Sequence, residues 1–157
     1  MKMILYNIGK TDTVFVRQGI EEYHKRIRNF IDFSIVDLPV VKHTKSTSPA
    51  DLIAKEAGII LNAVSDSDIV VLLDETGREY TTREFSGWLE KLMNQSIKKI
   101  AFVSGGAYGF SENVYKTSKY QLSLSKMTFT HQMVRLFFTE QLYRALTIIR
   151  GIPYHND

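Results

Sequence analysis

Apolar and polar residues follow one another along the chain in blocks that predict strands and helices in turn. Nearly continuous apolar runs at residues 3–8, 33–38, 69–73 and 100–103 have the length and composition of buried strands. Between these runs, apolar residues recur every three or four positions, as on the inner face of a helix. This alternation predicts an α/β fold with an open, mostly parallel sheet and helices on its faces.

Polar residues mark where the expected helices begin. Asp12 stands where it can cap the first helix, and Ser48 before a proline is a typical N-cap. Thr81 and Glu84 have the spacing of a capping box. Each expected helix after a long apolar run therefore has its own start signal.

A small-polar turn and a long helix follow the last expected strand. Residues 122–124 are strand-like, residues 125–130 form the turn, and His131 opens a mostly apolar helix that runs to Ile149. Apolar residues occupy more than one side of this helix, so we expect it to be buried on two sides. Because a chain of this length has little interior to surround a helix, the pattern favours a homodimer interface.

Two arginines interrupt this apolar helix. An unpaired guanidinium is costly to bury, so Arg135 and Arg144 should each meet a carboxylate, a phosphate or an opening to solvent. A salt bridge to a residue such as Glu140 is the ordinary solution.

Three loops are expected to gather at one edge of the sheet. Ligands of open α/β sheets bind at the carboxyl ends of the strands, here after Leu73, where residues 74–77 end the strand, after Val103 and after Leu124. Gly105 and Gly106 allow close approach of backbone to a ligand, although a tight turn explains them equally well. They match neither a Walker loop nor a dinucleotide fingerprint.

Residues 123–129 alternate small hydroxyl residues with apolar ones. Such a loop can offer backbone groups to the edge of a purine and apolar walls to its faces. A loop that merely connects a strand to a helix has the same composition, so the pattern leaves both interpretations open.

Composition narrows the class of protein. The 157 residues, 44% hydrophobic and 24% charged, fit a single domain over residues 1–157. There is no cysteine, which excludes disulfides and thiolate metal sites, and no ligand cluster suggests a metal. No apolar run reaches the ~18 residues of a membrane span, and the start of the chain does not resemble a signal peptide. We expect a cytoplasmic protein without a membrane or metal partner.

The net charge of +3 is unevenly distributed. Residues 44–97 carry five Lys and Arg against nine Asp and Glu, whereas residues 98–157 carry eight against three. Basic charge beside the loops would attract the phosphates of a nucleic acid. A solvated basic face accounts for the same counts.

Ionisable and aromatic residues near the C-terminus are further candidates. His131 heads the long helix, where a histidine more often fixes a loop than catalyses. Tyr154 and His155 follow Pro153, an unusual pair for a frayed end. An ordered functional tail and a floppy end are equally compatible with these residues.

Taken together, these segments resemble the small SPOUT-class methyltransferases that methylate a pseudouridine at N3 in large-subunit ribosomal RNA, the RlmH family. The resemblance spans nearly the whole chain, and the last three of its segments are the most specific. The segments are Ile8-Gly9-Lys10, Glu22-Tyr23-x-Lys25-Arg26, Leu73-Asp74-x-x-Gly77, Gly105-Gly106-x-x-Gly109, Leu122-Ser123-x-Ser125-Lys126-Met127-Thr128-Phe129-x-His131, Glu140-Gln141-Leu142-Tyr143-Arg144-Ala145 and Arg150-Gly151-x-Pro153-Tyr154-His155.

The resemblance implies a fold and a ligand that periodicity alone does not. Members of the family form homodimers, and their C-terminal segment passes through a loop to make a trefoil knot. S-adenosylmethionine lies bent in that knot. The positions that contact it correspond here to Leu73, Gly105, Leu124, Ser125, Lys126, Met127, Thr128 and Phe129. The implied substrate is a pseudouridine in 23S rRNA of the assembled ribosome.

Methylation of an imide nitrogen at neutral pH needs a base or stabilisation of the resulting anion. His155, on a tail that can cross to a partner subunit, is the expected base, because histidine titrates closest to neutrality. Arg144 is expected to steady the anion or a phosphate, Tyr154 to orient the base and His131 to support the loop.

The sequence departs from the family pattern at two places. Thr130 stands where a proline commonly precedes the histidine, so the turn is expected to be less rigid. Asn156 and Asp157 follow Tyr154-His155 where some members carry a basic residue, which weakens any role for a terminal cation.

Two alternatives remain on the residues alone. One is a non-catalytic RNA- or nucleotide-binding dimer on the same scaffold, in which the glycines hold phosphate. The other is a flavodoxin-like domain that binds a small molecule.

Overall fold

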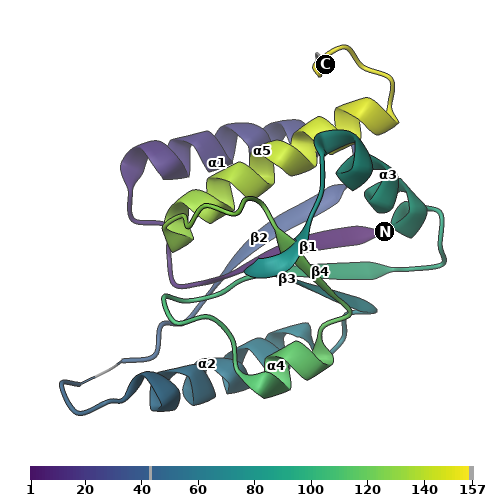
Figure 1. Ribbon diagram of the computed structural model, residues 1–157. Helices are drawn as coiled ribbons and strands as arrows, with labels where there is room; N and C mark the ends of the chain where they lie inside the picture. The colour runs from purple at the N-terminus through teal and green to yellow at the C-terminus, as the bar shows by residue number, and fades with distance from the viewer. Residues whose placement is uncertain (43, 156–157) are drawn as a thin grey trace.

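Parallel strands form one open sheet in the computed structural model, which describes residues 1–42 and 44–155 (Figure 1). The sheet order is β2-β1-β4-β3-β5, and every neighbouring pair is parallel. The strands are β1 (Lys2–Ile8), β2 (Asp32–Leu38), β3 (Ile69–Glu79), β4 (Lys99–Ser104) and β5 (Tyr120–Ser123). The predicted α/β fold with a parallel sheet is confirmed.

Helices follow the strands in alternation. They are α1 (Val14–Ile27), α2 (Pro49–Val64), α3 (Thr82–Met93), α4 (Glu112–Thr117) and α5 (His131–Ile149). Helices α2 and α3 begin at their predicted caps. The side chain of Ser48 accepts a hydrogen bond from the Asp51 backbone, and Thr81 and Glu84 form the expected capping box.

The start of α1 differs from the prediction. Its N-cap is Thr13 rather than Asp12, and the Thr13 side chain makes no capping hydrogen bond. Instead, the backbone N–H of Thr13 donates to Oε1 of Gln132 at 2.9 Å. A contact with α5 therefore replaces the local cap, which a sequence pattern cannot reveal.

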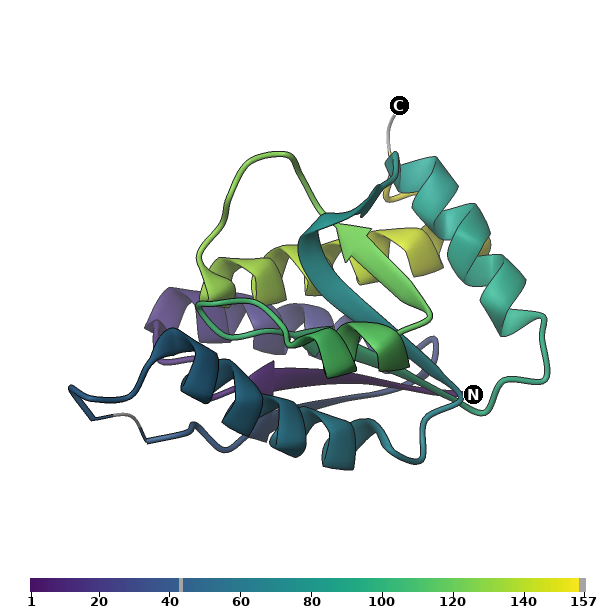
Figure 2. The same cartoon turned by 60° about the horizontal axis from the view of Figure 1, so that its bottom comes forward.

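Helices cover both faces of the sheet (Figures 1 and 2). One core lies on the side of α1, α3 and α5, and the other on the side of α2 and α4. Fully buried side chains such as Leu89 and Leu142 each contribute about 1.5–3 kcal/mol of burial free energy. The two cores hold the sheet rigid beneath the loops at its carboxyl edge.

The apolar breadth of α5 is explained within one protomer. On one side Tyr143 packs against Tyr23 of α1, with ring centroids 5.9 Å apart. On another side the backbone oxygen of Ala145 accepts a hydrogen bond from Ser86 of α3 at 3.2 Å. α1, α3 and the sheet cover much of α5 within one protomer, so its apolar breadth does not by itself require a partner subunit, and the homodimer interface stays a prediction.

β3 is longer than the apolar run predicted. It continues beyond Leu73 to Glu79, and its register with β5 shifts between Leu73 and Arg78, both of which pair with Leu122. Figure 2 shows the end of β3 curving beside β5 before the chain enters α3. The expected strand end at residues 74–77 is therefore wrong. The apolar pattern missed the extension because its residues are polar and largely exposed.

Arg135 is fully buried and pairs with neutral oxygens. Its Nη1 donates to the backbone oxygen of Gly9 and to Oγ1 of Thr11, both at 3.0 Å, and its Nη2 donates to the backbone oxygen of Ile8 at 2.6 Å. Burial lowers its pKa against the attraction of Asp37 and Asp12. The expected carboxylate, phosphate or solvent partner is wrong for this residue, which fastens α5 to the loop after β1.

Candidate functional site

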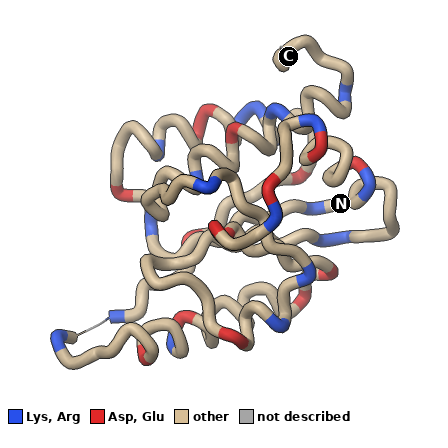
Figure 3. The backbone as a smooth tube through the Cα atoms, in the orientation of Figure 1, with Lys and Arg blue, Asp and Glu red and all other residues tan. Residues whose placement is uncertain are grey.

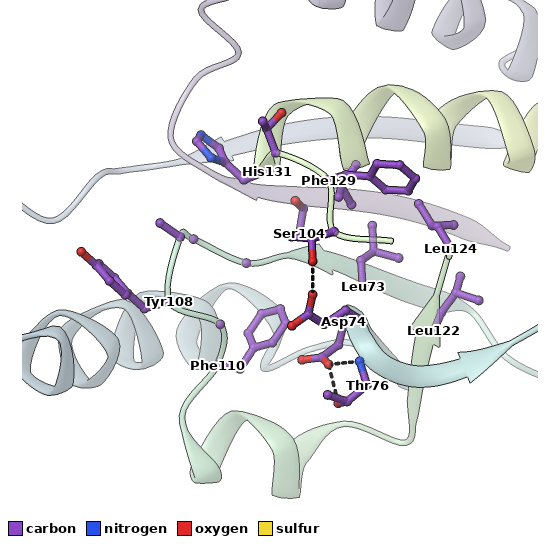
Figure 4. Close-up of a pocket in the computed structure, with 18 of the residues that line it drawn as sticks. Leu73, Asp74, Thr76, Ser104, Tyr108, Phe110, Leu122, Leu124, Phe129 and His131 are labelled. Carbon is purple, nitrogen blue, oxygen red and sulfur yellow. Dashed lines mark hydrogen bonds between the residues drawn. The ribbon is translucent and has the colours of Figure 1, made fainter. Parts of the chain in front are cut away.

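A cavity of about 700 Å³ opens at the carboxyl ends of β3, β4 and β5 (Figure 4). Residues 73–76, 104–110 and the segment from Leu122 to Val134 supply most of its lining. Its volume lies in the range of roughly 300–1,000 Å³ that is typical of small-molecule sites. The three loops predicted to meet at this edge do form one cavity.

The glycine loop after β4 packs closely against the body of the protein. A Cβ atom on Gly105 would lie 2.9 Å from Cζ of Phe110, and one on Gly106 would lie 2.7 Å from Oε2 of Glu56. Glu56 of α2 is buried, and this burial raises its pKa. A side chain at either position would have to displace the Phe110 ring or the Glu56 carboxylate, so glycine allows this close packing.

Asp74 holds a carboxylate at the floor of the cavity. Its Oδ1 accepts hydrogen bonds from the backbone N–H of Thr76 at 2.8 Å and from the Thr76 hydroxyl at 2.5 Å, and its Oδ2 accepts one from the Tyr115 hydroxyl. Burial acts to raise the pKa of Asp74, but the hydrogen bonds from Thr76 and Tyr115 together outweigh it and lower the pKa. Asp74 is therefore ionised at neutral pH.

The loop between β5 and α5 is pinned by its own hydroxyl groups. Oγ of Ser125 accepts a hydrogen bond from the Met127 backbone at 2.9 Å, and Oγ of Ser123 donates to the backbone oxygen of Ser125 at 3.0 Å. The Thr128 hydroxyl donates to Oε2 of Glu75 at 3.2 Å, across the cavity mouth. These hydrogen bonds fix the conformation of the loop that forms this wall of the cavity.

Most of the residues predicted to bind the cofactor lie together around this cavity. The residues of that set in the lining are Leu73, Gly105, Leu124, Ser125, Met127, Thr128 and Phe129. Lys126 is exposed and lies outside the lining.

His131 also lines the cavity, as the first residue of α5. The preceding Thr130 is the N-cap, and its side chain accepts a hydrogen bond from the Met133 backbone at 3.3 Å. Burial and the Arg135 guanidinium lower the pKa of His131, while Asp12 acts weakly in the opposite direction. Its imidazole is therefore neutral at physiological pH.

The other predicted catalytic residues, Arg144, Tyr154 and His155, are not part of the cavity lining, and Arg144 lies toward the C-terminal end of α5. An α-helix rises 1.5 Å per residue, so His131 and Arg144 are about 20 Å apart along the axis. Arg144 makes the predicted salt bridge to Glu140, with Nε at 2.9 Å and Nη2 at 2.5 Å from Oε1. Its guanidinium lies 4.7 Å from the ring centroid of Tyr154.

The C-terminal tail packs against α1 and α5 through Tyr154. The backbone N–H of Ile152 donates to the oxygen of Thr147 at 2.9 Å, and the Tyr154 ring packs 4.8 Å from that of Tyr143. A hydrogen bond with Tyr154, together with burial, raises the pKa of Tyr23 to about 12. The tail therefore contacts the body of the protein through Tyr154, and a functional role for it stays a prediction.

The expected basic charge does not line the cavity. The lining contains the carboxylates of Asp74 and Glu75 and neither lysine nor arginine. Lys98 and Lys99 stand at the start of β4, at the other edge of the sheet. Figure 3 shows Lys and Arg spread over both helical layers, so charge that is clustered in sequence is dispersed in space.

Neither a cluster of metal ligands nor a membrane-spanning helix occurs in residues 1–42 and 44–155. No three His, Asp or Glu side chains there gather as metal ligands. No helix in the same part of the chain is long and apolar enough to cross a bilayer.

Comparison with known proteins places the chain in a family. A family model described as a predicted SPOUT methyltransferase matches residues 1–155. The chain belongs to the SPOUT methyltransferase family. The same relationship was expected from the sequence motifs, and it is confirmed.

Other SPOUT methyltransferases resemble this chain over its full length. It is 48% identical over 157 residues to the ribosomal RNA large subunit methyltransferase H of Parabacteroides distasonis, covering 100% of both chains. It is 48% identical over 156 residues to the protein of the same name from Christiangramia forsetii, covering 99% of both. The solved tRNA (m1G37) methyltransferase of Aquifex aeolicus shares the fold, with a TM-score of 0.53 and 14% identity over 100% of this chain and 76% of that chain.

The sequence motifs of this SPOUT methyltransferase did not indicate that acidic side chains line its cavity. Asp74, Glu75 and Tyr115 line the cavity but were not among the predicted site residues. The position of Asp74, directly after the most apolar strand, was the available signal. Tyr115 on the short α4 had no such signal, because only the fold brings α4 beneath this loop.

Proposed function

We propose that the chain transfers a methyl group from S-adenosylmethionine to N3 of a pseudouridine in 23S rRNA of the assembled ribosome. The observation that carries this proposal is the cavity built from the glycine loop, the end of β3 and the loop before α5. Full-length relatives at 48% identity are named ribosomal RNA large subunit methyltransferase H, which supports the same substrate class here.

The chemistry of the cavity fits S-adenosylmethionine. Leu73, Leu122 and Phe129 provide apolar surface suited to the purine, and the backbone of residues 124–129 provides donors and acceptors for its edge. Asp74 and Glu75 suit ribose hydroxyls or the positive charges of the ligand. When bound, this ligand supplies an electrophilic methyl group on a sulfonium centre.

A knotted C-terminal segment is part of the proposal. The end of β3 lies hard against β5, since a Cβ on Gly77 would be 2.6 Å from the carbonyl carbon of Gln121. The Thr128–Glu75 hydrogen bond joins the next loop to the same stretch of chain. This close passage of two segments supports a trefoil knot of the kind expected for the family.

The active form is proposed to be a cytoplasmic homodimer. Arg144 lies about 20 Å along α5 from His131 in the cavity of its own protomer, and Tyr154 packs beside Arg144. A partner subunit that brings this end of its α5 to the cavity would complete the site. Exposed apolar side chains beside the start of α5, Phe15 and Phe137, suit the interface that such an arrangement requires.

Within this dimer we assign roles to individual side chains. His155 of the partner subunit accepts the N3 proton of the pseudouridine, and Tyr154 orients it. The Arg144 guanidinium, held in place by Glu140, stabilises the negative charge that spreads over the flanking carbonyl oxygens. His131, neutral at the cavity rim, supports the loop over residues 124–130.

Transfer of labelled methyl groups tests the function. Wild-type protein should label ribosomes, while free ribosomal RNA and ribosomes that lack the pseudouridine should remain unlabelled. His155→Ala should lower the single-turnover rate on ribosomes by about 10²-fold or more, with unchanged affinity for S-adenosylhomocysteine. Labelling that does not depend on the pseudouridine would refute the assigned substrate. A wild-type rate in His155→Ala would refute the assignment of His155 as the base.

A further inference from the structure

A second cavity of about 350 Å³ lies beside α1, at the carboxyl ends of β1 and β2. It shares no lining residue with the larger cavity. Its strand residues are Asn7 of β1 and Ile35 and Asp37 of the neighbouring β2. Ligands of open α/β sheets gather outside the carboxyl ends of the strands, so this cavity occupies a place suited to a second site.

A buried acceptor without a partner lies in the lining of this cavity. Asn7 is 1% exposed, and its Nδ2 donates to Oδ1 of Asp37 at 3.1 Å, which fixes the orientation of the amide. Oδ1 of Asn7 is buried and has no hydrogen-bond partner. A buried carbonyl is costly when unpaired, so it calls for a donor from outside the chain. Asp37 is exposed and adds a carboxylate beside it.

Apolar and cationic groups complete the cavity. Ile20 of α1 and Ile35 of β2 supply apolar lining, and Lys10 and Arg17 stand exposed in the same lining. Neither cation forms an ion pair with another described residue. The combination suits a flat ring with a hydrogen-bonding edge and a phosphate beside it.

The balance of charges excludes a simple polyanion site. Asp12, Glu21 and Asp37 set three carboxylates against the two cations and His24. His24 is tied to the strand, since its Nε2 lies 3.2 Å from the backbone oxygen of Phe33 and donates to it. A ligand must therefore offer donors to the acidic part as well as one phosphate to the basic part.

We propose that this cavity binds an unstacked guanine nucleotide of the RNA substrate. Guanine presents two adjacent donors, N1–H and the N2 amino group, to the carbonyl of Asn7 and the carboxylate of Asp37. Uracil offers a single N–H between two carbonyl oxygens, which would face the carboxylate unfavourably. The apolar lining meets the base, and Arg17 or Lys10 meets its phosphate.

The two cavities are close enough to serve one RNA strand. Asn7 in the second cavity pairs in register with Ser104, which lines the first. Adjacent strands are separated by about 4.8 Å, so nucleotides near the methylated one reach the second cavity. This inference rests on the proposed RNA methylation and adds to it a second contact that selects a neighbouring base.

Matched substitutions test the contact in steady-state methyl transfer to ribosomes. Asp37→Asn and Arg17→Ala should each raise the KM for ribosomes by about tenfold, with little change in kcat. Asp32→Asn, at the other end of β2, and Arg28→Ala, beyond the other end of α1, should stay within twofold of wild type. Affinity for S-adenosylhomocysteine should be unchanged in all four variants, because none of the four residues lines the first cavity.

Nucleotide titration followed by amide NMR tests the site without catalysis. Guanosine 5′-monophosphate should shift resonances of residues 7–12, 17–24 and 35–37, and uridine 5′-monophosphate and inorganic phosphate should shift them far less. Asp37→Asn should abolish the difference between the two nucleotides. Equal shifts with both nucleotides, or control-like KM values for both cavity variants, overturn the inference. Selective guanine shifts in a protein that methylates no ribosome would support the site and refute the proposed function.

Discussion

A buried guanidinium shows how single residues shape this site. Among the described residues, the Arg135 guanidinium donates hydrogen bonds to the backbone oxygens of Ile8 and Gly9 rather than to a carboxylate. It lies one turn after His131 on α5, so the bonds that hold the loop after β1 also hold the start of α5. Its charge, together with burial, keeps His131 neutral at the cavity rim. Arg135 thus contributes both to the stability of the fold and to the charge state of His131 at the cavity.

Replacing Arg135 should measure its contribution to the free energy of unfolding. Arg135→Met should lower the free energy of unfolding by about 2–4 kcal/mol, because two buried carbonyl groups lose their donors. Arg28→Met, at an exposed arginine after α1, should change it by less than ~0.5 kcal/mol. Urea denaturation measures both, and equal stabilities of the two variants would show that the carbonyls find other partners.

The Tyr115 hydroxyl is expected to govern the titration of Asp74. The pKa of Asp74 lies below its ordinary value of 3.8, so its ionised form contributes stability that is present above that value and lost as the pH falls through the folded-state pKa. In Tyr115→Phe one hydrogen bond to the carboxylate is lost, and the pKa of Asp74 should rise.

Carboxyl-carbon NMR measures this midpoint directly. Tyr108→Phe is the control, because Tyr108 lines the same cavity but is 57% exposed and makes no hydrogen bond to Asp74. An unchanged midpoint in Tyr115→Phe would mean that Thr76 alone sets this pKa.

At the scale of elements, the decisive feature is the passage of β3 along β5. The apolar half of β3 is a central strand, and its polar half runs on past the cavity to α3. That extension presents Asp74 and Glu75 to the cavity and brings Gly77 against the backbone of Gln121. The same few residues therefore shape the site and the close packing of β3 against the backbone of β5.

Two glycine substitutions should have opposite effects on stability. Gly77→Ala places a Cβ within 2.6–2.7 Å of the Gln121–Leu122 backbone, which cannot rotate away, so it should destabilise the fold by about 1–3 kcal/mol. Gly58→Ala in α2 meets nothing within 4 Å and should stabilise it by about 0.5–1 kcal/mol. Thermal denaturation distinguishes the two variants. An unchanged thermal midpoint in Gly77→Ala would contradict close packing of Gly77 against the backbone of β5.

At the scale of the whole molecule, the proposed machinery is divided between the two ends of α5. The cavity and His131 lie at one end, and Arg144 and Tyr154 lie at the other. The protomer covers much of α5 by itself, so the proposal of a dimer rests mainly on this separation and only secondarily on exposed apolar side chains such as Phe137.

Disrupting the proposed interface should separate the subunits. Phe15 is 63% exposed on α1, one turn before Gly19, which packs against Leu136 of α5. Phe15→Glu should give monomers in sedimentation equilibrium and lose methyl transfer while still binding S-adenosylhomocysteine. Val40→Glu, at a 61% exposed residue after β2, is the matched control and should remain dimeric. Fully active monomers of Phe15→Glu would refute a site shared between subunits.

Much of this organisation was predictable from local patterns. The four long apolar runs became strands, the hydroxyl residues Ser48 and Thr81 became caps, and the loops after Val103 and Leu124 met where parallel strands end. The polar end of β3 was missed because exposed strand residues carry no apolar period. The partners of Arg135 were missed because backbone oxygens leave no trace in a sequence.

The sequence by itself determined the fold class, the family and the loop that lines the cavity, because apolar period, capping residues and motif spacing are local properties of the chain. Only the tertiary structure decided which charges face that cavity, since basic residues clustered in sequence are dispersed in space and Asp74 and Glu75 take their place. Only it separated Arg144 and Tyr154 from the cavity, because a helix turns distance in sequence into distance in space.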